Sequence, residues 1–353
     1  MNQSIKFDFN DIVLVPKAQS EINSRNECNP FTIFEGCDML PLMAAPMDTV
    51  VSPENFMFYI KNGIIPCIPR GQYANNIHSS IRFQSFGLCD IEKSLYGSMS
   101  ERNNSVLKHF SYILIDIANG NMKKIVDVLK EIKTHYPTRI IMVGNIANPE
   151  TFVELAKAGA DYIRCSIGTG AGCTTAANVA INYPMGSLIS ECRQKKIQGG
   201  WNAKIVADGG MRNYSDIIKA LALGADYVMI GNLFNKAIES AGFNYLYGIK
   251  INDKLAKVLW KYNFPVKKKY RGMSTKAVQR SWGKSRLITA ENDENDGHLF
   301  WHRATLDQLK EKKWYPEFLI RLKAKSLQAY EKEMRKYQKN INLFADEEDN
   351  DYI

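Results

Sequence analysis

The chain has 353 residues, of which 45% are hydrophobic, and a formal net charge of +9. This length can bury a large core, and no apolar run reaches the ~18 residues that cross a bilayer. The N-terminus lacks the apolar core of a signal peptide. The seven cysteines are an odd number without a Cys-x-x-Cys pair, which argues against a disulfide framework and a zinc site. These features predict a cytoplasmic protein with reduced thiols and no membrane partner.

Eight short apolar runs alternate with stretches of helical pattern between residues 40 and 231. We expect strands over residues 40–45, 63–68, 94–98, 112–117, 140–145, 162–166, 204–208 and 227–231. Helices are expected over residues 121–135, 149–158 and 215–223, which begin at Asn, Pro or Ser and end near a glycine. Runs with polar residues only at their carboxyl ends are typical of parallel strands buried on both faces. Eight such units close into a (β/α)8 TIM barrel, which we expect to span residues 1–299.

The C-terminal region has a different composition. Residues 303–345 are rich in Lys and Arg, and residues 346–353 form an acidic tail. This pattern is more typical of a solvated helix and a frayed end than of an arm that binds nucleic acid, so no nucleic-acid partner is expected. Apolar residues at helical spacing from Leu306 to Tyr330 predict a helical extension over residues 300–345, packed on the barrel or on a neighbouring subunit.

Polar residues follow the predicted strands where barrels carry their chemistry. They are Asp48, Asp116, Asn119, Asn145, Cys173, Asp208 and Asn232. Any one of them fits a helix cap or a turn, but so many at one edge favour a site. The segments 208–210 and 231–232 occupy the usual phosphate position of barrels, where free backbone N–H groups and a helix N-terminus receive an anion. The sequence therefore predicts a ligand that carries a phosphate.

The loop at residues 165–175, Cys-Ser-Ile-Gly-Thr-Gly-Ala-Gly-Cys-Thr-Thr, follows the sixth predicted strand. Its glycines at alternate positions let a ligand approach the main chain closely. Cys173 fits a nucleophile, with Thr174 or Thr175 within reach of the group it attacks. Taken alone, the motif is more often a glycine-rich turn with a buried cysteine. Its place after a barrel strand favours the reactive loop.

Five motifs in register resemble the IMP dehydrogenase and GMP reductase family. They are Ala-Pro-Met-Asp-Thr-Val at residues 45–50, Gly-Asn at 144–145, the loop at 168–175, Ala-Asp-Gly-Gly-Met-Arg at 207–212 and Tyr-Arg-Gly-Met-Ser at 270–274. The likeness runs from about Phe7 to about Met273. The chain departs from the family pattern at Ala171, Ala176 and Asn232.

The resemblance implies a mechanism and a set of site residues. Cys173 would attack C2 of the purine ring of a nucleoside monophosphate, and hydride would pass between that carbon and a nicotinamide. The implied substrate-binding residues are Met47, Asp208, Gly209, Gly210, Gly231, Asn232, Arg271, Gly272, Met273 and Ser274. The implied cofactor-binding residues are Asp116, Asn119, Gly120 and Asn145. The family also implies a homotetramer and a monovalent cation, K+, held at Gly168, Gly170 and Cys173.

Three functions stay open on these motifs. The first is GMP reductase, which converts GMP and NADPH to IMP, ammonia and NADP. The second is IMP dehydrogenase, which converts IMP, NAD and water to XMP and NADH. The third is a barrel that binds nucleotide but has lost catalysis, against which the joint presence of Cys173, Thr175, Asp208 and Asn145 speaks. The link between the second and third predicted strands, residues 69–93, is too short for the paired regulatory domains of many IMP dehydrogenases.

Two features favour the reductase. Dehydrogenases of the family use an Arg-Tyr pair after the Tyr-Arg-Gly-Met motif, and none occurs between Ser274 and Gly297. Reductases use the second Thr of the loop with a Glu, which points to Thr175 with Glu291, or with Glu294 as the alternate. Glu291 also fits an ordinary acidic loop. Residues 116–120 resemble the reductase cofactor segment, whereas residues 45–48 and 270–272 look more like a dehydrogenase. We therefore expect GMP reductase with NADPH, and NAD as the alternative cofactor.

Overall fold

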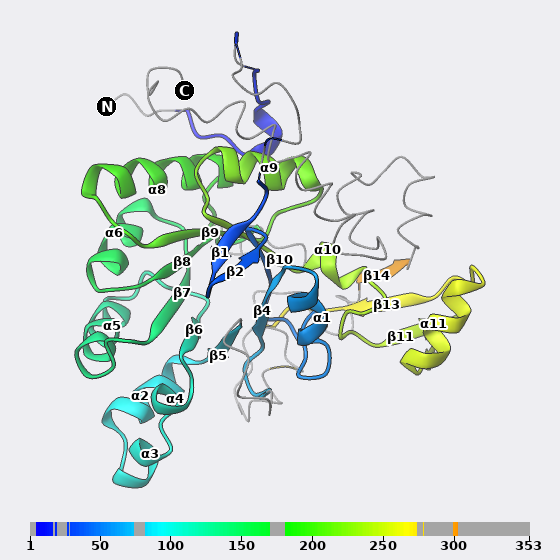
Figure 1. Ribbon diagram of the computed structural model, residues 1–353, viewed down its shortest axis with the longest axis horizontal. Coiled ribbons are helices and arrows are strands. Elements are labelled where there is room, and N and C mark those ends of the chain that lie inside the picture. The colour runs from blue at the N-terminus through cyan, green and yellow to red at the C-terminus, as the bar shows by residue number, and fades with distance from the viewer. Residues whose placement is uncertain are drawn as a thin grey trace.

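The structure, a computed structural model, describes residues 5–16, 18–19, 27, 29–73, 82–169, 181–273, 278 and 299–302. Eight parallel strands close into a barrel in the order β10-β3-β4-β5-β6-β7-β8-β9 (Figure 1). The strands are β3 (Leu42–Ala44), β4 (Ile65–Ile68), β5 (Phe83–Phe86), β6 (Tyr112–Asp116), β7 (Ile140–Ile146), β8 (Tyr162–Cys165), β9 (Lys204–Asp208) and β10 (Tyr227–Ile230). The predicted (β/α)8 barrel is confirmed.

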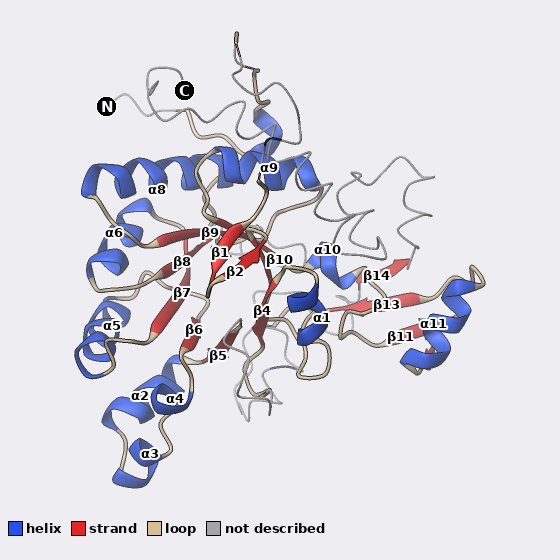
Figure 2. Ribbon diagram, in the orientation of Figure 1, coloured by secondary structure: helices blue, strands red, loops and turns tan. Residues whose placement is uncertain are grey.

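Helices surround these strands (Figure 2). They are α1 (Phe56–Lys61), α2 (Leu88–Tyr96), α3 (Met99–Asn103), α4 (Val106–His109), α5 (Lys123–His135), α6 (Pro149–Lys157), α8 (Met185–Gly199), α9 (Tyr214–Ala222) and α10 (Asn232–Asn235). The three helices expected from the sequence, α5, α6 and α9, are confirmed. Helix α5 shows why the pattern worked, because it buries residues at positions i, i+3, i+4 and i+7: Ile125, Val128, Leu129 and Ile132. Among the described residues, no helix is long and apolar enough to cross a membrane.

The third strand of the barrel is β5, so the prediction of a strand over residues 94–98 is wrong. Residues 94–96 end helix α2, which begins after Gly87 and stops at Gly97. The segment Phe83-Gln84-Ser85-Phe86 does not look like an apolar run, yet all four residues are buried. Gln84 can be buried because its amide donates to the carbonyl of Gln72 at 2.8 Å. The link between β4 and β5 is therefore even shorter than expected.

A second sheet lies beside the barrel. It has the order β12-β11-β13-β14, formed by β11 (Asn244–Leu246), β12 (Ile249–Ile251), β13 (Lys267–Tyr270) and β14 (Leu299–His302), and it carries helix α11 (Asp253–Lys261). Strand β14 pairs with β13 across the predicted boundary at residue 299, so that boundary falls inside a strand. The rest of the expected helical extension and the acidic tail lie outside the described residues.

Aromatic side chains close the amino end of the barrel. The hairpin of β1 (Thr32–Phe34) and β2 (Cys37–Met39) places Phe34 against the first residues of the strands. The ring centroid of Phe34 lies 5.4 Å from that of Tyr112, 6.1 Å from Phe83 and 6.4 Å from Tyr162. Since this end is filled by packed rings, a ligand can reach the barrel only from the carboxyl end.

The sequence Gly-Ala-Asp-Tyr occurs twice, before β8 and before β10. In both copies the aspartate joins a lysine of an outer helix to the backbone of the preceding strand. Asp161 accepts hydrogen bonds from Lys133 Nζ and Ile141 N, each at 2.7 Å. Asp226 accepts from Lys196 Nζ at 2.8 Å and from Ile205 N at 2.7 Å. Burial lowers the pKa of Lys196, and Asp226 opposes that shift, so the pair keeps this lysine charged inside the protein.

Replacing Asp226 with Asn should lower the free energy of unfolding by about 2 kcal/mol, because the buried ammonium of Lys196 loses its counter-ion. Urea unfolding followed by circular dichroism measures this change. The control is Glu154→Gln, which removes an ion pair to Lys157 whose side chains are 58% and 50% exposed. It should cost less than about 0.5 kcal/mol. Equal losses in the two variants would contradict the structural role of Asp226.

Candidate active site

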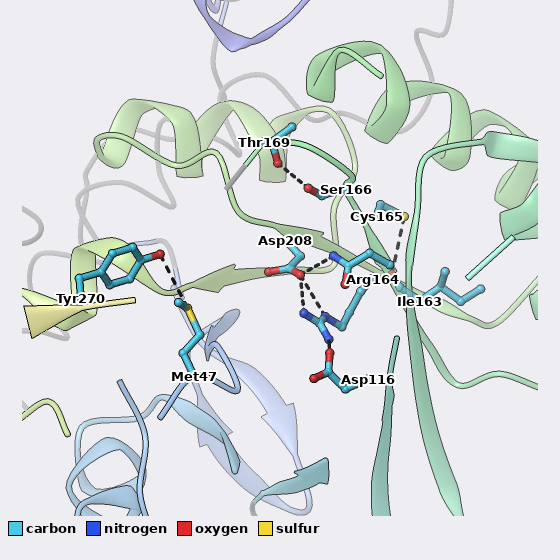
Figure 3. A network of polar contacts seen from close by, with 10 residues as sticks. Met47, Asp116, Ile163, Arg164, Cys165, Ser166, Thr169, Asp208 and Tyr270 are labelled. Carbon is cyan, nitrogen blue, oxygen red and sulfur yellow. Dashed lines mark hydrogen bonds and ion pairs between the residues drawn. The ribbon is translucent and has the colours of Figure 1, made fainter. Parts of the chain in front are cut away.

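A buried arginine joins two carboxylates at the carboxyl end of the barrel (Figure 3). Arg164, in β8, donates from Nη1 to Oδ1 of Asp116 at 2.6 Å. It also donates from Nη2 and Nε to Oδ2 of Asp208, at 2.7 and 3.0 Å. The amide of Asn145 donates to the same oxygen of Asp208 at 2.6 Å. Strands β6, β7, β8 and β9 thus contribute one side chain each to a connected polar network.

The network leaves one oxygen of each carboxylate unused. Arg164 is 6% exposed, and burial by itself would lower the pKa of its guanidinium. The charges of Asp208 and Asp116 outweigh burial, so the pKa of Arg164 is raised and the side chain stays a cation. Within the described part of the chain, no hydrogen bond reaches Oδ2 of Asp116 or Oδ1 of Asp208. In Figure 3 this second oxygen of Asp208 points away from Arg164.

Backbone pairing beyond β6 sets Asp116 beside Asn145. Ile117 N donates to Gly144 O at 3.0 Å, and Asn145 N donates to Ile117 O at 2.7 Å. Gly120 N then donates to Asn145 O at 2.7 Å, and a Cβ on Gly120 would lie only 2.8 Å from that oxygen. A glycine is therefore required at position 120 for this contact.

Asn119 has a local role in the same segment. Its Oδ1 accepts hydrogen bonds from the backbone N and the side-chain amide of Asn121, both at 3.1 Å. This side chain closes a turn ahead of α5. The cofactor contacts expected for Asn119 and Gly120 stay predictions, whereas Asp116 and Asn145 belong to the charged network.

The opposite side of the barrel mouth carries methionines and a second ion pair. Arg271, after β13, pairs with Asp48, which follows β3. The backbone N of Asp48 donates to Sδ of Met273 at 3.3 Å, and the hydroxyl of Tyr270 lies 3.8 Å from Sδ of Met47.

A glycine lets Met47 approach the end of β10. A Cβ on Gly231 would lie 2.6 Å from Sδ of Met47, so this close approach requires a residue without a side chain. The structure thereby brings together the predicted substrate residues Met47, Gly231, Arg271, Gly272 and Met273.

The predicted phosphate segment forms a tight turn after β9. Gly209 and Gly210 have φ angles of 83° and 78°, a region that favours glycine. A Cβ on Gly210 would lie 3.2 Å from Cβ of Thr169, so this turn packs against the start of the cysteine loop. Oδ1 of Asn232, after β10, is buried and has no hydrogen-bond partner among the described residues.

Several predicted site residues lie outside the described residues. They are Gly170, Cys173, Thr175, Ser274 and Glu291. Of the predicted cation ligands only Gly168 is described, with a φ angle of 83°. In the described part of the chain, no group of three or more His, Cys, Asp or Glu side chains could hold a metal ion. The K+ site therefore stays a prediction.

Arg164 is the member of the network that sequence reasoning missed. It lies in the segment Tyr162-Ile163-Arg164-Cys165, which we read only as a buried strand. A signal was present, because a charge inside a buried strand needs a counter-charge. The adjacent strand β9 and the next strand but one, β6, both end in aspartate, which is where the partners are found.

A cavity of 780 Å³ lies on the side of the Asp48 and Arg271 ion pair, and it does not include the Arg164 network. Its wall contains Asp48 and Arg271, together with residues of the segments 52–58, 238–243 and 253–257. Neither Arg164 nor Asp208 lines it. The connected charges at the strand ends, rather than this cavity, mark the candidate active site.

Comparisons with known proteins agree with the motifs. The IMP dehydrogenase / GMP reductase domain matches residues 95–296. A GMP reductase of Buchnera aphidicola subsp. Schizaphis graminum is 31% identical over 296 residues, which cover 80% of each chain. A GMP reductase of Bacillus subtilis is 32% identical over 253 residues, covering 67% of this chain and 73% of the relative. A GMP reductase of Caenorhabditis elegans is 29% identical over 305 residues, covering 82% of each chain. Together with the barrel and the motifs at its carboxyl end, these matches show that the chain belongs to the IMP dehydrogenase / GMP reductase family.

Proposed function

We propose that the protein is a GMP reductase that converts GMP and NADPH to IMP, ammonia and NADP. The family consists of oxidoreductases that act on purine nucleotides, and the similar proteins named above are GMP reductases. The observation that carries the proposal is the pair of carboxylates on either side of Arg164. Each presents one oxygen that no described residue uses.

The unused carboxylate oxygens of Asp208 and Asp116 can each accept a hydrogen bond from one ribose. A ribose hydroxyl donates a hydrogen bond, and a carboxylate oxygen is a strong acceptor. Asp208 stands beside the glycine turn at Gly209 and Gly210, so it binds the ribose of a nucleotide whose phosphate lies on that turn. Asp116 ends β6, which is separated from β9 by two strands; with Asn145 it binds the ribose of the nicotinamide. The two acceptors therefore fit both a nucleoside monophosphate and a nicotinamide cofactor.

The proposed chemistry is carried by the loop after β8. The thiolate of Cys173 adds to C2 of GMP, and the bond from C2 to the amino nitrogen breaks. Thr175 passes a proton to the departing nitrogen, with Glu291 as the source, so that ammonia leaves. NADPH, when bound, supplies the hydride that C2 then gains. The bond between C2 and the sulfur breaks last, which returns the Cys173 thiolate and releases IMP.

IMP dehydrogenase is the second candidate, because the same residues serve that reaction in the opposite redox direction. The Asp48 and Arg271 pair belongs to motifs that look more like the dehydrogenase pattern. NAD is then the cofactor, and water must be activated to hydrolyse the oxidised adduct. The homotetramer, the bound K+ and the cytoplasmic location also stay predictions.

An assay at 340 nm separates these functions. The protein is mixed with GMP and NADPH in one cuvette, and with IMP and NAD in another. We expect absorbance to fall in the first and to stay constant in the second. NADH production from IMP without NADPH consumption by GMP would reverse the proposal in favour of the dehydrogenase. Activity in neither mixture would support a barrel that only binds nucleotide.

Replacing Cys173 with Ala should abolish turnover, because the nucleophile is lost. Binding of GMP should stay within about tenfold, since contacts to phosphate and ribose are unchanged. Turnover by absorbance and binding by calorimetry measure the two effects. Cys89→Ala is the control, because that exposed thiol lies in α2, and it should keep full activity. Retained turnover in the Cys173 variant would rule out the covalent mechanism.

Replacing Asp208 or Asp116 with Asn should weaken binding of one ligand at a time, either GMP or NADPH. Asp208→Asn should raise KM for GMP about tenfold and change KM for NADPH little, because one charge-assisted hydrogen bond to the nucleotide is lost. Asp116→Asn should do the reverse. Asn still accepts from Arg164, so the network keeps its hydrogen bonds. Equal changes of both KM values in both variants would contradict the assignment.

A further inference from the structure

The N-terminal segment of residues 5–11 lies against the start of helix α8 and against helix α9 (Figure 1). It contains the short helix η1 (Phe9–Asp11), which is capped by Asp8. Phe9 is buried in the main core, and its carbonyl accepts a hydrogen bond from Lys219 of α9. The segment is therefore a fixed part of the fold, although it is almost 180 residues from α8 in sequence.

Ser187 in the first turn of α8 holds this segment by two hydrogen bonds. The backbone N of Phe7 donates to Oγ of Ser187 at 2.8 Å, and the backbone N of Ser187 donates to the carbonyl of Phe7 at 3.0 Å. Ser187 is only 2% exposed, so the serine side of both bonds is buried. At the N-terminus of a helix, such bonds satisfy groups that the helix itself leaves unpaired.

The ring of Phe7 lies directly on Gly186. A Cβ at Gly186 would be 2.6 Å from Cδ2 and Cε2 of Phe7, so the contact needs glycine at that position. A few residues further on, Glu191 joins the same two segments. It accepts a hydrogen bond from the hydroxyl of Tyr183 at 2.6 Å and forms an ion pair with Lys6.

These contacts converge on the last residues of the loop that carries Cys173. The segment that carries Cys173 lies between β8, which ends at Cys165, and α8, which begins at Met185, and its residues 170–180 lie outside the described residues. Its first residues are held by a hydrogen bond between the hydroxyls of Ser166 and Thr169 and by the packing of Thr169 on Gly210. At its far end, Tyr183 and the first turn of α8 contact residues 6 and 7.

We propose that the N-terminal segment of residues 5–11 positions the catalytic loop by clamping its far end at residues 183–187. The inference rests on the proposed role of Cys173 as nucleophile. Attack requires the sulfur within about 3–3.5 Å of C2, and a displacement of ~1 Å can cost about a hundredfold in rate. Contacts at residues 166–169 and at residues 183–187 fix the two described ends of the segment that carries Cys173. Phe7 and Ser187 are positioning residues in this scheme.

The test uses Phe7→Ala and Ser187→Ala in the full chain. The first removes the ring on Gly186, and the second removes the acceptor for Phe7 N. Each should lower kcat for GMP about 10- to 100-fold while KM for GMP changes less than about threefold, because the strand ends that hold ribose and phosphate are unaffected. In the unaltered protein, GMP should slow the alkylation of Cys173 by iodoacetamide, which mass spectrometry measures. In the two variants this slowing should be lost.

Lys195→Ala is the matched control. Lys195 also lies on α8 and forms an ion pair with Glu150, but no hydrogen bond or ion pair joins its side chain to residues 5–11. It should keep the kcat and the alkylation pattern of the unaltered protein. The exposed thiols of Cys37 and Cys89 serve as internal standards, since their alkylation should be the same in all variants.

The outcomes separate this proposal from the proposed function. If the unaltered protein turns over GMP and GMP protects Cys173, but Phe7→Ala and Ser187→Ala behave like Lys195→Ala, the clamp is wrong and the function stands. If the unaltered protein shows neither turnover nor protection, the proposed function fails first. If Phe7→Ala does not fold, the kcat, KM and Cys173 alkylation of Ser187→Ala alone test the clamp. A rise in KM with unchanged kcat would also overturn the positioning role.

Discussion

The charge of Arg164, buried between Asp116 and Asp208, is the constraint on which the carboxyl end of the barrel depends. A buried cation without partners is very costly, whereas one with two carboxylates and good geometry is tolerated. The partners come from β6 and β9, on either side of Arg164 in the barrel. Their meeting depends on the pairing register, in which Asp116 lies opposite Gly144, and Gly144 opposite Arg164. A shift of one residue would turn these side chains to the other face.

That constraint also explains residues that have no chemistry of their own. A Cβ at Gly144 would lie 2.5 Å from Cβ of Arg164, so a glycine in β7 is what lets the arginine lie across this strand. Asn145 then donates to the oxygen of Asp208 that already accepts from Arg164. Because one oxygen of Asp208 receives three donors, the other keeps a fixed direction. Preorganised acceptors of this kind bind a hydroxyl without a further loss of side-chain entropy.

Most of the fold could be predicted from the sequence, and the failures have physical causes. Seven of the eight strands carry apolar runs, which report burial on both faces of the barrel. Strand β5 carries Gln84 in its interior, and that burial depends on tertiary contacts of its amide with the carbonyls of Gln72 and Pro69. Arg164 was missed for the same reason, since its partners lie 48 and 44 positions away in sequence. Asn119 was placed at the strand end correctly, but a local turn occupies its side chain.

The repeated Gly-Ala-Asp-Tyr segments show how one local structure serves two purposes. After Tyr162 and Tyr227, which both face the barrel interior, the next inward residues are Arg164 in β8 and Met229 in β10. Two residues after the tyrosine, β8 therefore places a cation on one side of the barrel mouth, and β10 places an apolar thioether on the other. Met229 pairs in register with Met43, and Met47 lies close beyond them over Gly231. Under the proposed function, the charged side suits the riboses. The polarizable methionine side suits the flat face of a purine, because thioether sulfur packs well against aromatic rings.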